Sequence, residues 1–104
     1  MTKLKQILPD FIAEVQQALR EIDFQYLADD LNRSELNQWT KNRKNDSLYI
    51  SVKSDAKRCE SVVLEELEGW VVVDVDGKDR VIGIETFKRD DIRRILEESN
   101  DPTG

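Results

Sequence analysis

The stretch WVVVDVDGKDRVIGIET (residues 70–86) decides the fold, because two runs of β-branched residues flank a turn signal. Valine and isoleucine favour strands, and the Asp-Gly-Lys-Asp tetrad at residues 76–79 is typical of a tight turn. The pattern predicts a hairpin with Val75 opposite Arg80. In that register the residues on the core face are Val71, Val73, Val75, Ile82 and Ile84. Those on the other face are Trp70, Val72, Asp74, Val81, Gly83 and Glu85.

The second face of this hairpin is half apolar, and Gly83 leaves a gap on it that we expect Trp70 or Val72 to cover. A sheet that is apolar on both faces needs cover on both. The pattern therefore predicts helices against one face. A helix, a second subunit or a partner protein is expected against the other.

The residues before the hairpin predict further strands. The clearest is the stretch from Leu48 to Lys53, in which apolar residues alternate strictly with polar or aromatic ones. This alternation is typical of a half-buried strand. Leu36 to Lys41 is interpreted as its partner, joined to it by a polar turn at residues 42–46. A third, less clearly patterned strand is expected from Cys59 to Glu66. Cys59 lies beside Lys57 and Arg58 but has no base or second thiol near it in the sequence, so we interpret it as a strand-edge residue.

Helical periodicity appears before residue 32. An apolar stripe with spacings of three and four is formed by Leu8, Phe11, Val15, Leu19 and Ile22. It predicts a helix over residues 9–23, with Pro9 in the first turn, where its missing N–H has no cost. A second short or continuing segment is expected to extend to about residue 31, where Asp, Asn and Ser favour a turn.

The end of the chain predicts a short helix. Asp90 or Asp91 is expected to cap it, and Ile92, Ile95 and Leu96 form its narrow apolar stripe. The fold class is thus α+β, with an N-terminal helical segment on a small antiparallel β-meander of four to five strands and a C-terminal helix. We expect one domain, residues 1–104, made of a helical extension (1–35), the sheet (36–86), the helix (87–99) and a frayed tail (100–104).

Composition excludes several kinds of chemistry. The chain has no histidine and one cysteine, which removes Ser-His-Asp and Cys-His catalysis and zinc sites with four Cys or His ligands. We therefore expect no enzyme, no cofactor and no metal. No apolar run approaches the ~20 residues that span a bilayer, and the N-terminus lacks a signal-peptide pattern, so a cytoplasmic protein without a membrane segment is expected.

Charge is distributed unevenly along the acidic chain, which has a net charge of −6. Residues 36–58 hold six basic and two acidic residues, a net charge of +4. An acidic whole repels nucleic acid at long range, which argues against a nucleic-acid partner. The alternative that remains open is a small-ligand or nucleic-acid surface in the basic segment, formed by Lys41, Arg43, Lys44 and Lys53 with the aromatic residues Trp39 and Tyr49.

The acidic residues of the hairpin do not suggest catalysis. In the predicted register the backbones of Asp74 and Glu85 lie about 13 Å apart, which does not favour a pair of catalytic carboxylates. Asp76 and Asp79 are explained by the turn, and the run from Asp74 to Asp79 lacks the length and closing Glu of a calcium loop. Asp74 interrupts a run of valines, so we favour a structural anchor that accepts backbone, Tyr or Trp donors over a binding residue.

Two stretches, residues 39–52 (WTKNRKNDSLYISV) and 71–85 (VVVDVDGKDRVIGIE), together resemble a bacterial family known only as a domain of unknown function. The resemblance covers residues 36–86 and rests on the motifs formed by Asp46, Leu48, Tyr49, Ile50, Asp74, Gly83, Ile84 and Glu85. It implies a small antiparallel sheet and, since members lie beside small toxin-like genes, an antitoxin-like or partner-binding role. Lys41-Asn42 replaces a family Tyr-Asp, and an N-terminal extension of about 35 residues precedes the resembling segment.

These observations favour a non-catalytic protein-interaction module that forms a homo-oligomer or binds a protein partner, because the core is thin and the sheet is apolar on its second face. The candidate interaction or ligand surface consists of Trp39, Lys41, Arg43, Lys44, Tyr49, Lys53, Trp70, Asp74 and Glu85.

Overall fold

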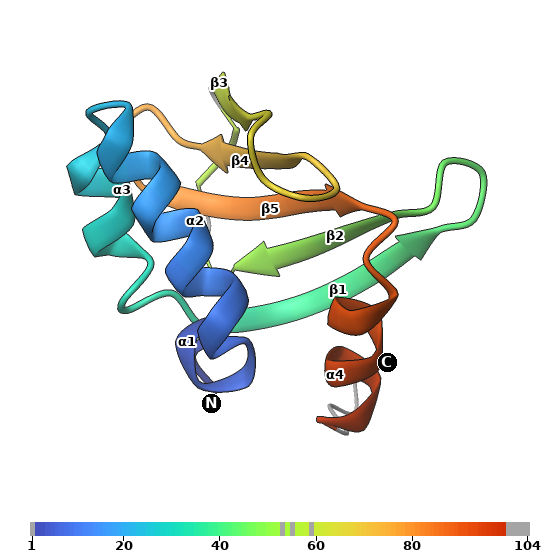
Figure 1. The fold of residues 1–104 in the computed structure, drawn as a ribbon. Helices are drawn as coiled ribbons and strands as arrows, with labels where there is room; N and C mark the ends of the chain where they lie inside the picture. The colour runs from blue at the N-terminus through green and yellow to red at the C-terminus, as the bar shows by residue number, and fades with distance from the viewer. Residues whose placement is uncertain (1, 53, 55, 59, 100–104) are drawn as a thin grey trace.

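The computed structural model describes residues 2–52, 54, 56–58 and 60–99 and confirms the α+β class, with helices at both ends of the chain and an antiparallel sheet between them (Figure 1). The helices are α1 (Leu4–Ile7), α2 (Pro9–Glu21), α3 (Gln25–Asp30) and α4 (Asp90–Glu98). The strands are β1 (Leu36–Asn42), β2 (Ser47–Val52), β3 (Glu60–Leu64), β4 (Val71–Val75) and β5 (Val81–Phe87). No helix among these residues is long and apolar enough to cross a membrane.

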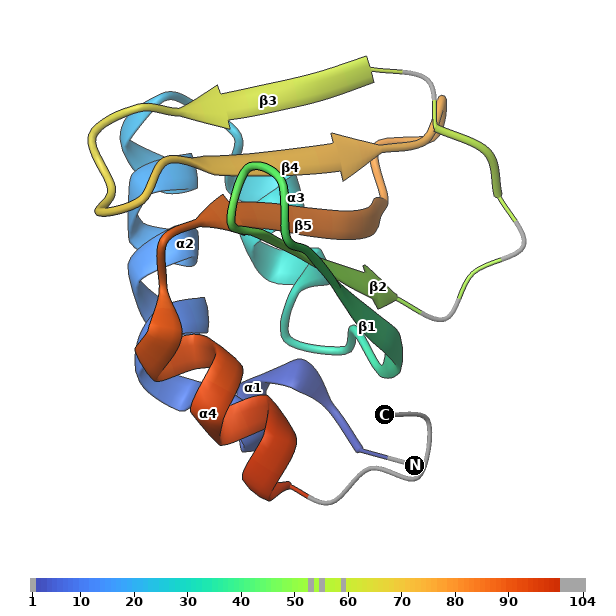
Figure 2. The same cartoon turned by 90° about the vertical axis from the view of Figure 1, so that its right-hand side faces the viewer.

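The five strands form one sheet in the order β1-β2-β5-β4-β3, and every neighbouring pair is antiparallel. The strand order departs from a continuous meander at one place. After the β1–β2 hairpin the chain passes to the far edge, and β3, β4 and β5 then return strand by strand until β5 lies beside β2 (Figure 2). This return makes β5 the central strand, and it brings β2 and β4 to either side of it.

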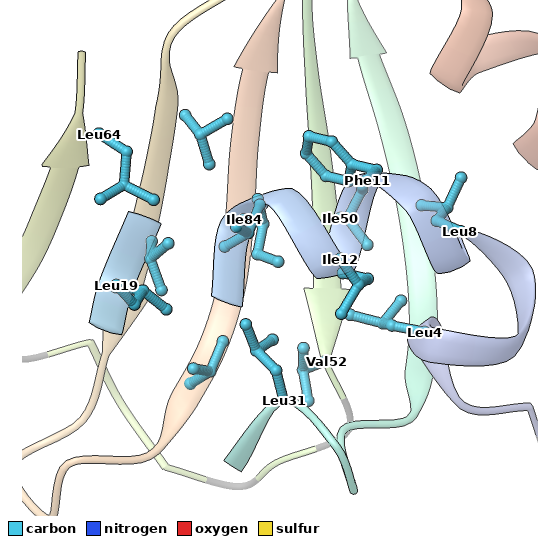
Figure 3. Close-up of a cluster of buried hydrophobic side chains, with 14 of the residues drawn as sticks. Leu4, Leu8, Phe11, Ile12, Leu19, Leu31, Ile50, Val52, Leu64 and Ile84 are labelled. Atoms are coloured by element: carbon cyan, nitrogen blue, oxygen red, sulfur yellow. The ribbon is translucent and has the colours of Figure 1, made fainter. Parts of the chain in front are cut away.

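Helix α2 crosses the strands on one face of the sheet and supplies most of the helical side of the core (Figure 3). Its stripe is buried as predicted at Leu8, Phe11, Val15 and Leu19, opposite Ile50 and Ile84 of the sheet. Ile22, the last residue of the predicted stripe, is 45% exposed because α2 ends at Glu21. Pro9 occupies the first helical turn, as expected.

Two helix ends differ from the prediction. The sequence did not predict α1, a single turn whose start is fixed by tertiary contacts: the Leu4 N–H donates to the Ser34 carbonyl, and the Leu36 N–H donates to the Thr2 carbonyl. At α4 the N-cap residue is Arg89 rather than Asp90 or Asp91, and no side chain caps the helix. Arg89 is buried, donates to the Asp91 carboxylate and lies over the Phe11 ring, so this end is held by packing onto α2.

The register of the β4–β5 hairpin is a second correction. Val75 pairs with Val81 instead of Arg80, and beyond a bulge Val73 pairs with Ile84. The pairing with Val75 puts Val81 on the core face in place of Ile82, which is only partly buried. The bulge inserts Ile82 as an extra residue, so Ile84 returns to the core face. The other core-face assignments, at Val71, Val73, Val75 and Ile84, are confirmed.

Asp76 closes the β4–β5 turn, as its position before Gly77 predicts. Its carboxylate accepts hydrogen bonds from the backbone N–H groups of Lys78 and Arg80 and from the Arg80 guanidinium, over 2.8 to 3.0 Å. These bonds, chiefly the one from the Arg80 N–H, lower the pKa of Asp76 below its ordinary value. The charged form of Asp76 therefore stabilises the turn.

We predict that Asp76→Asn lowers the free energy of unfolding at pH 7 and flattens its dependence on pH in acid. A lowered pKa contributes stability above the unfolded-state value of about 4, and this is lost as the pH falls through the folded-state value. Denaturant unfolding between pH 2 and 7 measures the effect. Asp79→Asn in the same turn is the control, because Asn also tolerates the positive φ of Asp79. Parallel pH profiles for the two variants contradict the prediction.

Candidate functional site

One face of the sheet carries the helices, and no helix among the described residues covers the other, which we call the open face (Figures 1 and 2). Strand pairing arranges side chains on it in two rows across β2, β5, β4 and β3. One row is formed by Ser51, Gly83, Asp74 and Ser61, and the second by Tyr49, Glu85, Val72 and Val63. These rows contain the candidate site.

Tyr49 closes the gap that Gly83 leaves in the first row. The tyrosine starts from the second row on β2 and leans diagonally across β5, so that a Cβ on Gly83 would overlap its phenol ring and hydroxyl. Only glycine permits this close approach, in which an aromatic ring covers the bare backbone of a strand. The sequence predicted the gap but not the residue that fills it, because Trp70 and Val72 were expected there.

Asp74 is the polar centre of the open face. It is only 7% exposed, and each of its carboxylate oxygens accepts one hydroxyl hydrogen bond. The Tyr49 hydroxyl donates over 3.0 Å and the Ser61 hydroxyl donates over 2.6 Å. The chain Tyr49–Asp74–Ser61 thus joins β2, β4 and β3 across the intervening β5, which is the anchoring arrangement that the sequence favoured for Asp74.

The environment keeps the Tyr49 phenol neutral. Partial burial, followed by the hydrogen bond to Asp74 and the Asp74 charge, raises the pKa of Tyr49 to about 12, while Arg58 acts weakly in the opposite direction. A phenol with such a pKa is a hydrogen-bond donor at neutral pH and a poor base or nucleophile. The described residues also contain no group of three or more acidic or cysteine side chains that could hold a metal ion.

Apolar side chains lie on the same face towards the start of β4. Trp70 is 57% exposed, Val63 is 48% exposed, and Val72 and Phe87 are partly buried. Trp70 and Phe87 line an open hollow of about 450 Å³ together with Asn45, Gly69 and Lys88. The backbone of Trp70 has a φ of +48°, in the left-handed region that bulky residues rarely adopt. Its large side chain is therefore held outward on a strained backbone.

The structure brings together four of the predicted surface residues and separates the others from them. Tyr49, Trp70, Asp74 and Glu85 lie on the open face, where the register puts Asp74 and Glu85 on diagonal positions about 7–8 Å apart. The predicted separation of about 13 Å is therefore wrong, because the observed register is shifted by two residues, one at the turn and one at the bulge.

The open face does not include Trp39, Lys41, Arg43 or Lys44. Trp39 pairs with the buried Ile50 and packs on the core, so it lies on the face opposite to Tyr49. Lys41, Arg43 and Lys44 are exposed at the end of the β1–β2 hairpin. Lys53, like Cys59, lies outside the described residues. Sequence analysis missed Ser61, Val63 and Phe87; Ser61 follows from the pairing of β3 with β4, which its weak pattern does not reveal.

One protein family matches the part of the chain that contains the open face. Residues 42–88 match the family "Protein of unknown function (DUF2283)". The matched segment runs from the end of β1 to just beyond β5 and leaves all four helices outside it. It overlaps the region where the sequence resembles a family of unknown function and supports that resemblance. No match was found among curated proteins or solved structures.

We predict that Tyr49 ionises near pH 12 in the folded chain and that Asp74→Asn moves this midpoint down towards 10, leaving the part due to burial. The phenolate absorbance of the wild type minus that of Tyr49→Phe gives the Tyr49 titration, and circular dichroism of the same samples reports the fold. A raised tyrosine pKa contributes stability that is complete below about pH 10 and is lost as the pH rises towards 12. A Tyr49 midpoint near 10 in the folded chain contradicts this assignment.

We also predict that Gly83→Ala lowers the free energy of unfolding by about 1 to 3 kcal/mol, because the new methyl group displaces the Tyr49 ring. In a Tyr49→Ser background the same substitution should have a much smaller effect. Chemical denaturation of the four chains of this double-mutant cycle measures the coupling. Gly77→Ala, at an exposed turn position, is the control. Equal losses in both backgrounds would show that Tyr49 is not the obstacle.

Proposed function

We propose that this protein is a non-catalytic protein-interaction module whose docking surface is the open face of the sheet. The observation that carries the proposal is Trp70, which is 57% exposed on a backbone with a φ of +48°. A left-handed conformation is unfavourable by roughly 1–2 kcal/mol for a residue with a Cβ atom. Neither the strain nor the exposure helps the isolated chain to fold, and both are explained if a partner covers the indole.

The surroundings of Trp70 support a protein partner. Val63, Val72 and Phe87 extend the apolar surface across three strands, while Glu85 on β5 and Lys88 beside Trp70 border it. Exposed aromatic and apolar residues inside a polar border are the composition of protein interfaces. An antitoxin-like role, with a second small protein as the partner, is the specific form that the family resemblance implies.

The chemistry of the open face supports binding rather than catalysis. Both carboxylate oxygens of Asp74 are engaged by hydroxyl groups, and the Tyr49 phenol stays protonated at neutral pH. The alternative, a ligand or nucleic-acid surface in the basic segment, is weakened because Trp39 and Tyr49 lie on opposite faces. Lys41, Arg43 and Lys44 are exposed on the hairpin, but the two aromatic residues are not on one face beside them.

We predict that Trp70→Asn abolishes the association of the tagged chain with a stoichiometric partner when it is purified from its own host. Asparagine keeps the left-handed backbone and removes the indole, so the fold is retained. Tyr26→Asn is the matched control, since Tyr26 is another exposed aromatic residue, at 46%, on α3 away from the open face. Native mass and circular dichroism are measured for each chain.

The expected result is a second protein bound to the wild type and to Tyr26→Asn but not to Trp70→Asn. A blue shift of tryptophan emission on binding, absent in Trp70→Asn, locates the contact at the indole. The proposal fails if the wild type is purified without a partner, or if Trp70→Asn binds as well as the control.

A further inference from the structure

The two edges of the sheet are protected very differently. At the β1 edge, residues 2–4 lie alongside the chain just before the strand: Lys3 forms a bridge with Glu35, and the Leu36 N–H donates to Thr2. Charged side chains at Lys41, Arg43 and Lys44 follow, and such charges discourage pairing between chains. The β3 edge carries the sequence Ser-Val-Val between Glu60 and Leu64, and within the described residues its only strand partner is β4.

An apolar hollow of about 180 Å³ adjoins the β3 edge. It is lined by Ala18 and Ile22 at the end of α2 and by Val63 and Leu64 of β3, with Glu65 and Glu66 at its border. Ile22 and Val63 are 45% and 48% exposed. The edge therefore offers both unpaired backbone and a place for apolar side chains, the two elements of recognition by strand addition.

The charges along this edge are self-complementary. Lys57 and Arg58 precede β3, Glu65 and Glu66 follow it, and all four are exposed. A second β3 laid antiparallel reverses this order, so the basic end of each strand faces the acidic end of the other. With Val62 at the twofold axis, Glu60 of one strand pairs with Leu64 of the other. The basic residues just before each strand then lie near the acidic residues just after the other. A parallel strand would set like charges against each other.

We propose that the β3 edge pairs antiparallel with the β3 edge of a second copy of this chain, forming a continuous ten-stranded sheet across a twofold axis. Such an interface is isologous, and it requires the self-complementary surface that this edge has. The two hollows and both Ile22 side chains then lie beside the new strand pair. This dimer goes beyond the proposed function, because it leaves Trp70 free for a different partner, although Val63 borders both surfaces.

Charge reversal at the two ends of β3 tests the pairing. Glu65→Lys/Glu66→Lys makes both ends of the edge basic, and Lys57→Glu/Arg58→Glu makes both ends acidic. Sedimentation of the wild type over a range of concentrations is expected to show a monomer–dimer equilibrium. Each variant alone should dimerise at least about tenfold more weakly, because like charges now face each other. An equimolar mixture of the two variants should dimerise at least as well as the wild type.

Arg43→Glu/Lys44→Glu is the matched control, since it reverses two exposed basic residues on the β1–β2 hairpin. Circular dichroism confirms that every variant is folded. As the dimer forms, hydrogen exchange of the wild type should slow at the alternate backbone N–H groups of β3 that point away from β4. Recovery of the dimer only in the mixture supports the proposal.

Three outcomes overturn it: a wild type that stays monomeric, a mixture that dimerises no better than its components, or a dimer lost with Trp70→Asn but not with the charge reversals. The last places self-association on the open face. Because Trp70→Asn leaves the charges of the β3 edge unchanged and Glu65→Lys/Glu66→Lys leaves Trp70 unchanged, failure of the edge dimer and failure of the proposed function are distinguishable.

Discussion

The packing of one helix across one face of the sheet is the constraint on which the structure depends. Thirteen residues of α2 at about 1.5 Å per residue span about 20 Å, and five strands at about 4.8 Å spacing span about 19 Å. A single helix laid across the strands therefore covers the full width of the sheet with one apolar stripe, from Leu8 to Leu19. The other helices among the described residues, α1, α3 and α4, are all shorter than α2 and supply no second layer of this size for the other face.

The side chains found on the open face are explained by the lack of a second helical layer. A buried carboxylate on a sheet needs donors, and Asp74 obtains them from side chains on the same face, Tyr49 and Ser61, rather than from a covering element. The tyrosine reaches Asp74 only because Gly83 on the intervening strand has no side chain. Hydrogen bonds thus join strands on this face, while apolar packing against α2 holds them together on the other. Different interactions therefore stabilise the two faces of the sheet.

Local periodicity predicted the helices and strands that have a repeated pattern. The features that it did not predict depend on contacts between residues far apart in the sequence. The alternation in β2 and the stripe of α2 are repeated patterns, so both elements and most of the stripe's burial followed from the sequence. Exceptions include Ile22, which is exposed, and Ile12 and Gln16, which are buried outside the predicted stripe. The bulge at Ile82 did not, because Val81 and Ile82 are equally apolar and β-branched and either could face the core. Ser61, Gly83 and Tyr49 meet only because β5 returns between β2 and β4, a strand order that no local pattern encodes. The single turn of α1 is fixed by contacts near Ser34 and has no periodic signal.

The features that folding alone does not explain lie in one corner of the molecule. Trp70 precedes Val72, which pairs with Val63 on β3, so the strained indole, the exposed valine and the open strand edge are neighbours. A chain selected only to fold would place asparagine or glycine at the left-handed position 70 and a charged residue at 63 on an edge strand. Trp70 and Val63, the residues found at these positions, instead expose apolar surface or leave the strand edge open. Their common location is what an interface requires, and it lies inside the segment matched by the family of unknown function.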